Sequence, residues 1–180
     1  MSAVHLLAAD APATHRPARL EPGILADIAY GLSRTAELWR PHLAEHPIHR
    51  SSLRLLASAE YDAWLLGWPP GTAVSPHDHG GSVGAFAVVS GELTEIRWRH
   101  PFRLSRVVSA GGIVTIDRGT VHDVVASGTT PALSVHAYSP PLSSMRFYDD
   151  AARDVVDVQP VTAQEPAVAT TRALHPARQH

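Results

Sequence analysis

The chain of 180 residues contains neither cysteine nor lysine. Without cysteine it has no disulfide, no thiolate metal ligand and no cysteine nucleophile, and the redox state of its compartment stays undetermined. Its fifteen basic residues are all arginine, and with seventeen acidic residues the formal net charge is −2. This near balance gives no support to nucleic acid or an anionic membrane surface as a partner.

Long apolar runs are missing as well. No segment approaches the ~20 apolar residues that a membrane-spanning helix needs. The N-terminal sequence lacks a basic start, and Asp10 interrupts its short apolar run, so it does not resemble a signal peptide. We therefore expect a protein of the cytoplasm that does not bind membranes. The sequence leaves the oligomeric state open, and a monomer is compatible with it.

The composition divides the chain into one domain and two ends. Residues 1–20 are rich in Ala, Pro and Arg and predict a flexible leader. Residues 158–180 are rich in Ala, Pro and Thr without periodicity, which is typical of a disordered tail. Residues 21–157 are then left as a single domain, and 44% hydrophobic content is enough for one core.

The domain begins with a helical pattern and continues with strands. Apolar residues recur at three- and four-residue spacing from Pro22 to Trp39, with Pro41 as the stop signal. Short strand patterns follow from Asp62 onward, separated by Gly, Pro and Ser/Thr clusters. The predicted strands are 63–68, 84–90, 92–99, 103–109, 112–116, 122–127 and 132–138. This spacing predicts an all-β sandwich or small barrel, capped on one side by the helix.

The stretch PHDHGG (76–81) is the strongest candidate for a metal site. His77 and His79 are two residues apart, so an extended backbone points both to one face and Asp78 to the other. His122 opens a later strand and can complete a set of three. Imidazole suits Fe, Zn, Cu or Ni, so these residue types do not name the metal. A set of three ligands leaves positions open, as a catalytic site requires.

The spacing of these histidines and the neighbouring glycines resembles the two cupin motifs. Gly71-x5-His77-x-His79-x4-Gly84-x6-Gly91 resembles the first, with Gly84 in place of the usual glutamate. Gly111-x5-Asp117-x-Gly119-x2-His122 resembles the second, with Asp117 in place of proline. The segments HDHGGSVGAF, SGELTE, GTVHDVV and PALSVHAYSPPL resemble the cysteine dioxygenase family, a thiol-oxidising branch of the cupins, over roughly residues 50–149.

This resemblance implies a small jelly-roll-like cupin barrel that binds Fe(II) through His77, His79 and His122. It implies that L-cysteine binds the iron through sulfur and nitrogen, and that both atoms of O2 are delivered to sulfur to give cysteine sulfinate. Some members of the family join a cysteine to the active-site tyrosine by a thioether. Gly84 occupies the matching position here, so the tyrosine of this chain should stay unmodified.

Ser134, His136 and Tyr138 alternate along SVHAY, so strand geometry places them on one face. By resemblance, Tyr138 is the phenol of the catalytic shell, His136 orients it and Ser134 supports His136. The alternative is a buried polar row that only satisfies its own hydrogen bonds. Ser139–Pro140 at the end of this segment is a candidate cis peptide.

An amino-acid substrate needs a partner for its carboxylate, and the planar fork of arginine suits that task. The candidates lie in HRSSLRLL, where spacing to Trp68 favours Arg54 over Arg50. The alternative for Arg54 is a solvated side chain at the junction of helix and barrel. Ser52 stands where the family often has a tyrosine. We expect Glu92 and Glu95 at the surface, away from the histidines.

Two other functions stay open from the sequence. The substrate can be another small thiol, such as 3-mercaptopropionate, which lacks the amine. Alternatively, the protein is a metal-binding cupin without redox activity, an isomerase or a ligand-sensing module, that carries Zn, Mn or Ni. Metal analysis and a comparison of thiols separate these alternatives.

Overall fold

A computed structural model describes residues 19–43 and 50–162 of the chain. Most of the leader expected at 1–20 and of the tail expected at 158–180 lies outside these residues. The described part contains two helices, α1 (Pro22–Arg34) and α2 (Ala36–Leu43). Its strands are β1 (Ser51–Ala57), β2 (Asp62–Trp68), β3 (Ala73–Asp78), β4 (Val83–Ser90), β5 (Glu92–Arg99), β6 (Phe102–Ser109), β7 (Ile113–Ile116), β8 (His122–Ala126), β9 (Ala132–Ser139), β10 (Ser144–Tyr148) and β11 (Val155–Pro160).

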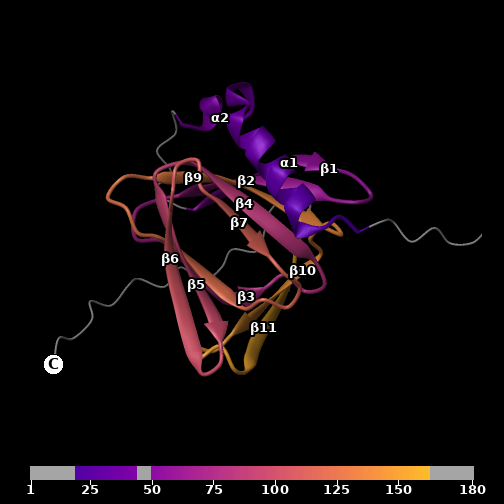
Figure 1. Cartoon of the computed structure of the whole chain (residues 1–180), viewed down its shortest axis with the longest axis vertical. Coiled ribbons are helices and arrows are strands. Elements are labelled where there is room, and N and C mark those ends of the chain that lie inside the picture. The colour runs from indigo at the N-terminus through magenta and orange to yellow at the C-terminus, as the bar shows by residue number, and fades with distance from the viewer. Residues whose placement is uncertain (1–18, 44–49, 163–180) are drawn as a thin grey trace, which may run out of the picture.

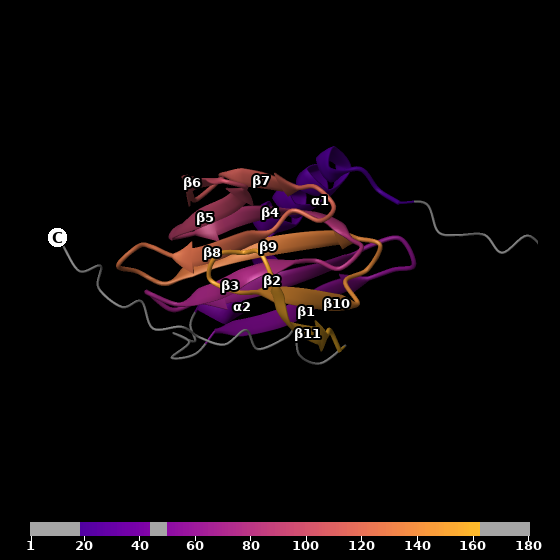
Figure 2. The same cartoon turned by 90° about the horizontal axis from the view of Figure 1, so that it is seen from below.

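The strands form two antiparallel sheets that face each other across an apolar interior (Figures 1 and 2). One sheet has the order β1-β2-β9-β4-β7, and the other has the order β11-β10-β3-β8-β5-β6. Large buried side chains from both sheets, among them Trp64, Phe86 and Leu93, fill the space between them. The all-β prediction is therefore confirmed, and the helices lie outside the barrel.

All seven strands predicted from the sequence are present, with each end within one residue of the expected position. Strands β1, β3, β10 and β11 complete the sheets. Strand β11 pairs with β10 as far as Pro160, which carries the fold three residues beyond the expected domain end at 157. The peptide bond between Ser139 and Pro140 is cis, at the end of β9.

Helix α1 covers the outer face of the five-stranded sheet (Figure 1), and this is the helical cap predicted from the sequence. Leu25 and Ala29 are fully buried there against small side chains of β4 and β9, such as Ala85 and Ala137. Because these side chains are short, the helix can approach the sheet closely. Among the described residues, no helix is long and apolar enough to span a membrane.

The single helix expected from Pro22 to Trp39 is two helices, because Thr35 interrupts it. The N–H of Thr35 bonds to the carbonyl of Leu32, and its hydroxyl bonds to the carbonyl of Gly31. In a continuous helix, the N–H of Thr35 would bond to the carbonyl of Gly31, but the Thr35 hydroxyl bonds to this carbonyl instead. Threonine side chains compete with helices in this way. Pro41, expected as the stop signal, lies inside α2 instead.

Candidate metal centre

Three histidines meet in the middle of the six-stranded sheet, where β3 ends and β8 begins. His77 lies near the end of β3, His79 follows that strand directly, and His122 is the first residue of β8. His77 and His122 are paired residues on adjacent strands, and their ring centroids lie 4.6 Å apart. All three side chains are buried, and one nitrogen atom from each lies within 4.8 Å of the others. The structure therefore brings the three expected ligands together.

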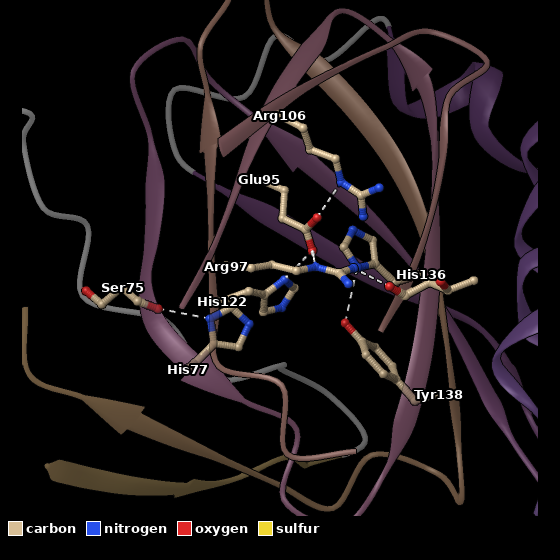
Figure 3. A network of polar contacts seen from close by, with 9 residues as sticks. Ser75, His77, Glu95, Arg97, Arg106, His122, His136 and Tyr138 are labelled. Atoms are coloured by element: carbon tan, nitrogen blue, oxygen red, sulfur yellow. Dashed lines mark hydrogen bonds and ion pairs between the residues drawn. The ribbon is translucent and has the colours of Figure 1, made fainter. Parts of the chain in front are cut away.

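The hydrogen bonds of these rings leave nitrogen lone pairs free for a metal. Nδ1 of His77 donates to the carbonyl of Ser75 at 2.9 Å, and Nδ1 of His122 donates to Glu95 Oε1 at 3.0 Å (Figure 3). In each ring Nε2 is then the unprotonated nitrogen. Nε2 of His122 is buried and has no hydrogen-bond partner among the described residues. A buried polar atom without a partner is costly, and a bound metal ion would satisfy it.

Burial also favours the neutral form that a metal requires. Desolvation lowers the pKa of His77 and of His79 well below 6.5, and the charges of neighbouring imidazoles lower both further. The rings are therefore neutral at pH 7 and compete weakly for protons. Three imidazoles at this separation fit a divalent transition metal.

Asp78 lies between the first two histidines but points away from them. Its carboxylate accepts hydrogen bonds from the backbone N–H of Gly80, from the Arg146 side chain and from the Tyr148 hydroxyl. The prediction that Asp78 faces the other side of the strand is confirmed. Asp78 connects β3 to β10 through these bonds and is not a member of the three-histidine group.

A row of polar side chains faces the histidines from the opposite sheet. It runs along β9 as Ser134, His136 and Tyr138, with Ser134 Oγ 2.8 Å from His136 Nε2 and His136 Nδ1 3.1 Å from the Tyr138 hydroxyl (Figure 3). The indole N–H of Trp68 donates to Ser134 Oγ at 2.9 Å and ends the row. Phe86 stacks on His136 at a centroid distance of 4.9 Å, which fixes the ring plane.

Tyr138 lies beside the three-histidine group, and the centroid of its ring is 4.6 Å from that of the His79 ring. Burial raises the pKa of Tyr138, and the charge of Asp62 raises it further, so the phenol keeps its proton. A Cβ atom added at Gly84 would lie 2.8 Å from Tyr138 Cδ1. Gly84 is therefore the residue that leaves room for this ring.

The histidines, Tyr138 and His136 line a small cavity of about 30 Å³. Arg50, Trp64 and Trp68 form other parts of the wall. One water molecule needs roughly 10–15 Å³ on this scale, so the cavity admits only a small ligand. Most of the wall is apolar, which strengthens any electrostatic contact inside.

Arg50 and Arg54, the two arginines considered for substrate binding, occupy different places. Arg50 lines the cavity with its guanidinium 4.4 Å from the centroid of the Trp68 ring, and its buried Nε has no hydrogen-bond partner among the described residues. Burial lowers the pKa of Arg50 to about 10, so it stays charged at pH 7. Arg54 is not part of the wall: it stacks on Trp64 and lies 3.5 Å from the carboxylate of Asp62.

Glu95 is buried, with 0% of its surface exposed, and the expectation of a surface position is wrong. Its carboxylate contacts His122, Arg97 and Arg106 (Figure 3). Burial would raise the pKa of Glu95, but the hydrogen bonds from His122 and Arg97 and the positive charge of Arg97 lower it to about 2. Alternation along β5 places Glu95 on the same face as the core residue Leu93, and this signal was available in the sequence.

Comparison with known proteins gives a family and a fold. The family described as cysteine dioxygenase type I matches residues 25–151, more than half of the chain. The protein TT1209 from Thermus thermophilus is 20% identical, with a TM-score of 0.50 over 57% of this chain and 94% of its own. A recombinant oxalate oxidase solved with glycolate is 24% identical, with a TM-score of 0.50 over 56% of each chain. At these identities the solved structures show the fold alone, which is the expected cupin barrel.

Proposed function

Because this chain belongs to the cysteine dioxygenase type I family, we propose that it is a non-haem iron thiol dioxygenase that converts L-cysteine and O2 to cysteine sulfinate. Both oxygen atoms go to the sulfur, so no further reductant is needed. The observation that carries the proposal is the buried three-histidine group beside a small cavity that also holds a charged arginine.

His77, His79 and His122 would hold the iron, each through a neutral imidazole. A ferrous ion there would supply the one-electron chemistry that allows O2 to react with a thiol. No carboxylate of the described residues joins the three histidines, because Gly84 has no side chain and Asp78 faces β10. A neutral set of three leaves positions open for a substrate and for oxygen.

Arg50, not Arg54, is the residue that we assign to the substrate carboxylate. Its guanidinium lines the cavity, is held against the Trp68 ring and pairs with no described acidic residue. A carboxylate that enters this apolar cavity would find in Arg50 a fork that can bond both oxygens. Arg54 is already engaged by Asp62 and Trp64, so it stabilises the junction between β1 and β2 instead.

Tyr138 would act as a neutral hydrogen-bond donor toward the substrate. Its raised pKa keeps the proton on the phenol, and His136 fixes the position of the hydroxyl. Ser134 hydrogen-bonds the other nitrogen of His136, and Trp68 donates a hydrogen bond to Ser134. The row therefore orients one O–H group in the cavity without placing a charge there.

The test is to load the purified protein with Fe(II) anaerobically and then follow O2 uptake with a panel of thiols. L-Cysteine should give one sulfinate for each O2 consumed, and cysteamine, which lacks the carboxylate, should react much more slowly. Bound iron without O2 uptake on L-cysteine would refute the proposal. Faster turnover with 3-mercaptopropionate would assign the other thiol, which Arg50 can also bind through its carboxylate. A site filled with Zn, Mn or Ni and inert to O2 would indicate a non-redox cupin.

A pair of variants tests the arginine assignment. Truncating one partner of a buried charge pair costs at least about 2 kcal/mol, so Arg50→Gln should raise KM for L-cysteine more than tenfold. Arg54→Gln, the matched control four residues along, should leave KM within about twofold and lower the thermal midpoint through the loss of its contact with Asp62. If Arg54→Gln raises KM and Arg50→Gln does not, the carboxylate binds at Arg54.

A further inference from the structure

Among the described residues, Glu95 is the one buried acid whose carboxylate hydrogen-bonds one of the three histidines, and it is not itself in ligand position. Its Oε1 lies 3.0 Å from Nδ1 of His122, on the nitrogen that faces away from the other two histidines. Both of its oxygens are engaged by donors. The carboxylate thus stands behind His122 and cannot reach the space between the three rings.

Two arginines hold this carboxylate in place. Nε of Arg106 donates to Oε2 at 2.6 Å, and Nε of Arg97 donates to Oε1 at 2.9 Å. Arg97 also donates through Nη2 to the carbonyl of Thr115 on β7. Because β7 belongs to the other sheet, this contact ties Arg97, and through it Glu95, to the five-stranded sheet.

From this arrangement we infer that Glu95 is a positioning residue for the metal centre. It fixes the tautomer of His122 so that Nε2 carries the free lone pair, and it fixes the plane of the ring toward His77 and His79. A hydrogen bond from a ligating imidazole to a carboxylate also makes the imidazole a stronger donor to the metal. Glu95 thereby places a negative charge next to His122, at a centre to which the described residues contribute no carboxylate ligand. The inference rests on the metal site of the proposed function.

The test measures metal binding, not turnover. The probe is Co²⁺, titrated into the metal-free protein and followed by its visible absorption, with a chelator as competitor. Glu95→Gln keeps the shape and removes the charge, so it should raise the Kd for Co²⁺ about 10- to 100-fold and alter the absorption spectrum. Glu92→Gln is the matched control on the same strand, since the Glu92 carboxylate accepts a hydrogen bond from Ser127 and is not part of the histidine network; the Kd of this variant should not change.

A second variant covers the case in which Glu95→Gln does not fold. Arg106→Gln removes one support of the carboxylate from a side chain that is 47% exposed, so the fold should tolerate it. It should raise the Kd in the same direction by a few-fold. An unchanged Kd and spectrum in the folded variants would overturn the inference and leave Glu95 as a structural residue. If the wild-type protein binds no Co²⁺, the metal site of the proposed function fails, and the inference fails with it.

Discussion

Gly84 determines where the Tyr138 ring can lie. A Cβ at this position would come within 2.8 Å of Cδ1 and 3.0 Å of Cε1 of the ring, and 3.2 Å from the carbonyl of Ala137. Gly84→Ala should therefore push the phenol away from His79 and cost about 1–3 kcal/mol of stability through overpacking. We expect kcat for the thiol substrate to fall at least about tenfold while iron binding stays within about twofold, since Gly84 touches no ligand.

Gly81 provides the control for this substitution, because a Cβ there would meet nothing within 4 Å. Gly81→Ala should keep both kcat and the thermal midpoint near the wild-type values. Iron content and oxygen uptake, measured on the same preparations of both variants, check the prediction. A Gly84→Ala protein with full activity would mean that the position of Tyr138 does not matter for turnover.

For single residues, the sequence predicts arrangements that depend on local spacing and misses those that depend on pairing between distant strands. The spacing of His77 and His79 follows from strand geometry, and His122 could be added because it opens a strand. Spacing could not show which of Arg50 and Arg54 lines the cavity, because that depends on which side chain passes over the Trp68 ring. The role of Glu95 depends on the pairing of β5 with β8, which places the acid behind His122.

At the scale of elements, glycine turns and β-branched runs mark the central strands clearly. Strand β3 escapes this pattern, because AVSPHD contains a proline, an aspartate and a histidine. These residues are unfavourable for strands in general and are present because β3 carries the site. Strands β10 (SMRFY) and β11 (VVDVQP) were not predicted, although Met145 and Phe147 alternate in β10 and β11 is rich in valine. Their place in the sheet comes from the pairing of β10 with β3 and of β11 with β10.

Helix α1 contributes stability without touching the site. Leu25 is fully buried between the helix and the five-stranded sheet, whereas its neighbour Ile24 is 49% exposed. Leu25→Ala should lower the free energy of unfolding by about 2–5 kcal/mol because it leaves a cavity in this layer. Ile24→Ala, the control, should change it by about 0.5 kcal/mol. Urea unfolding of both variants measures these values.

The same variants show whether the helix layer is independent of catalysis. Leu25 packs on the outer face of the sheet, and the cavity lies on the inner face. KM and kcat for the thiol should therefore stay near wild type in folded Leu25→Ala. A loss of activity larger than the loss of folded protein would indicate that the helix controls the position of β9 and its polar row.

At the scale of the whole molecule, each of the two sheets supplies different residues of the site. The six-stranded sheet supplies the three histidines and Glu95, while the five-stranded sheet supplies Tyr138 and His136. The cavity between the histidines and the polar row therefore forms only when the two sheets face each other. Folding also buries several imidazoles in the apolar interior, and the loss of their hydration opposes their protonation. The stability of the metal-free protein should depend on pH for this reason.

His77, His79 and His136 each have a pKa well below 6.5 in the folded protein, chiefly because of burial. Below about pH 6.5 the unfolded chain binds protons at these positions and the folded protein does not, so stability falls as the pH falls. Each histidine contributes about 1.4 kcal/mol per pH unit in that range. Below about pH 4.5 Glu95, with a folded pKa of about 2, adds a loss of the same sign.

Urea unfolding of the chelator-treated protein between pH 7.5 and 5.5 measures this dependence. The wild-type protein should lose several kcal/mol over these two pH units, and His79→Gln should lose about 1.4 kcal/mol less over the same range, because one proton-binding group has been removed. A saturating divalent metal should make the fall steeper, because protons compete with the metal for the same nitrogens. Equal free energies of unfolding at pH 7.5 and 5.5 would show that these imidazoles are solvated in the metal-free protein and that the barrel is not closed around them.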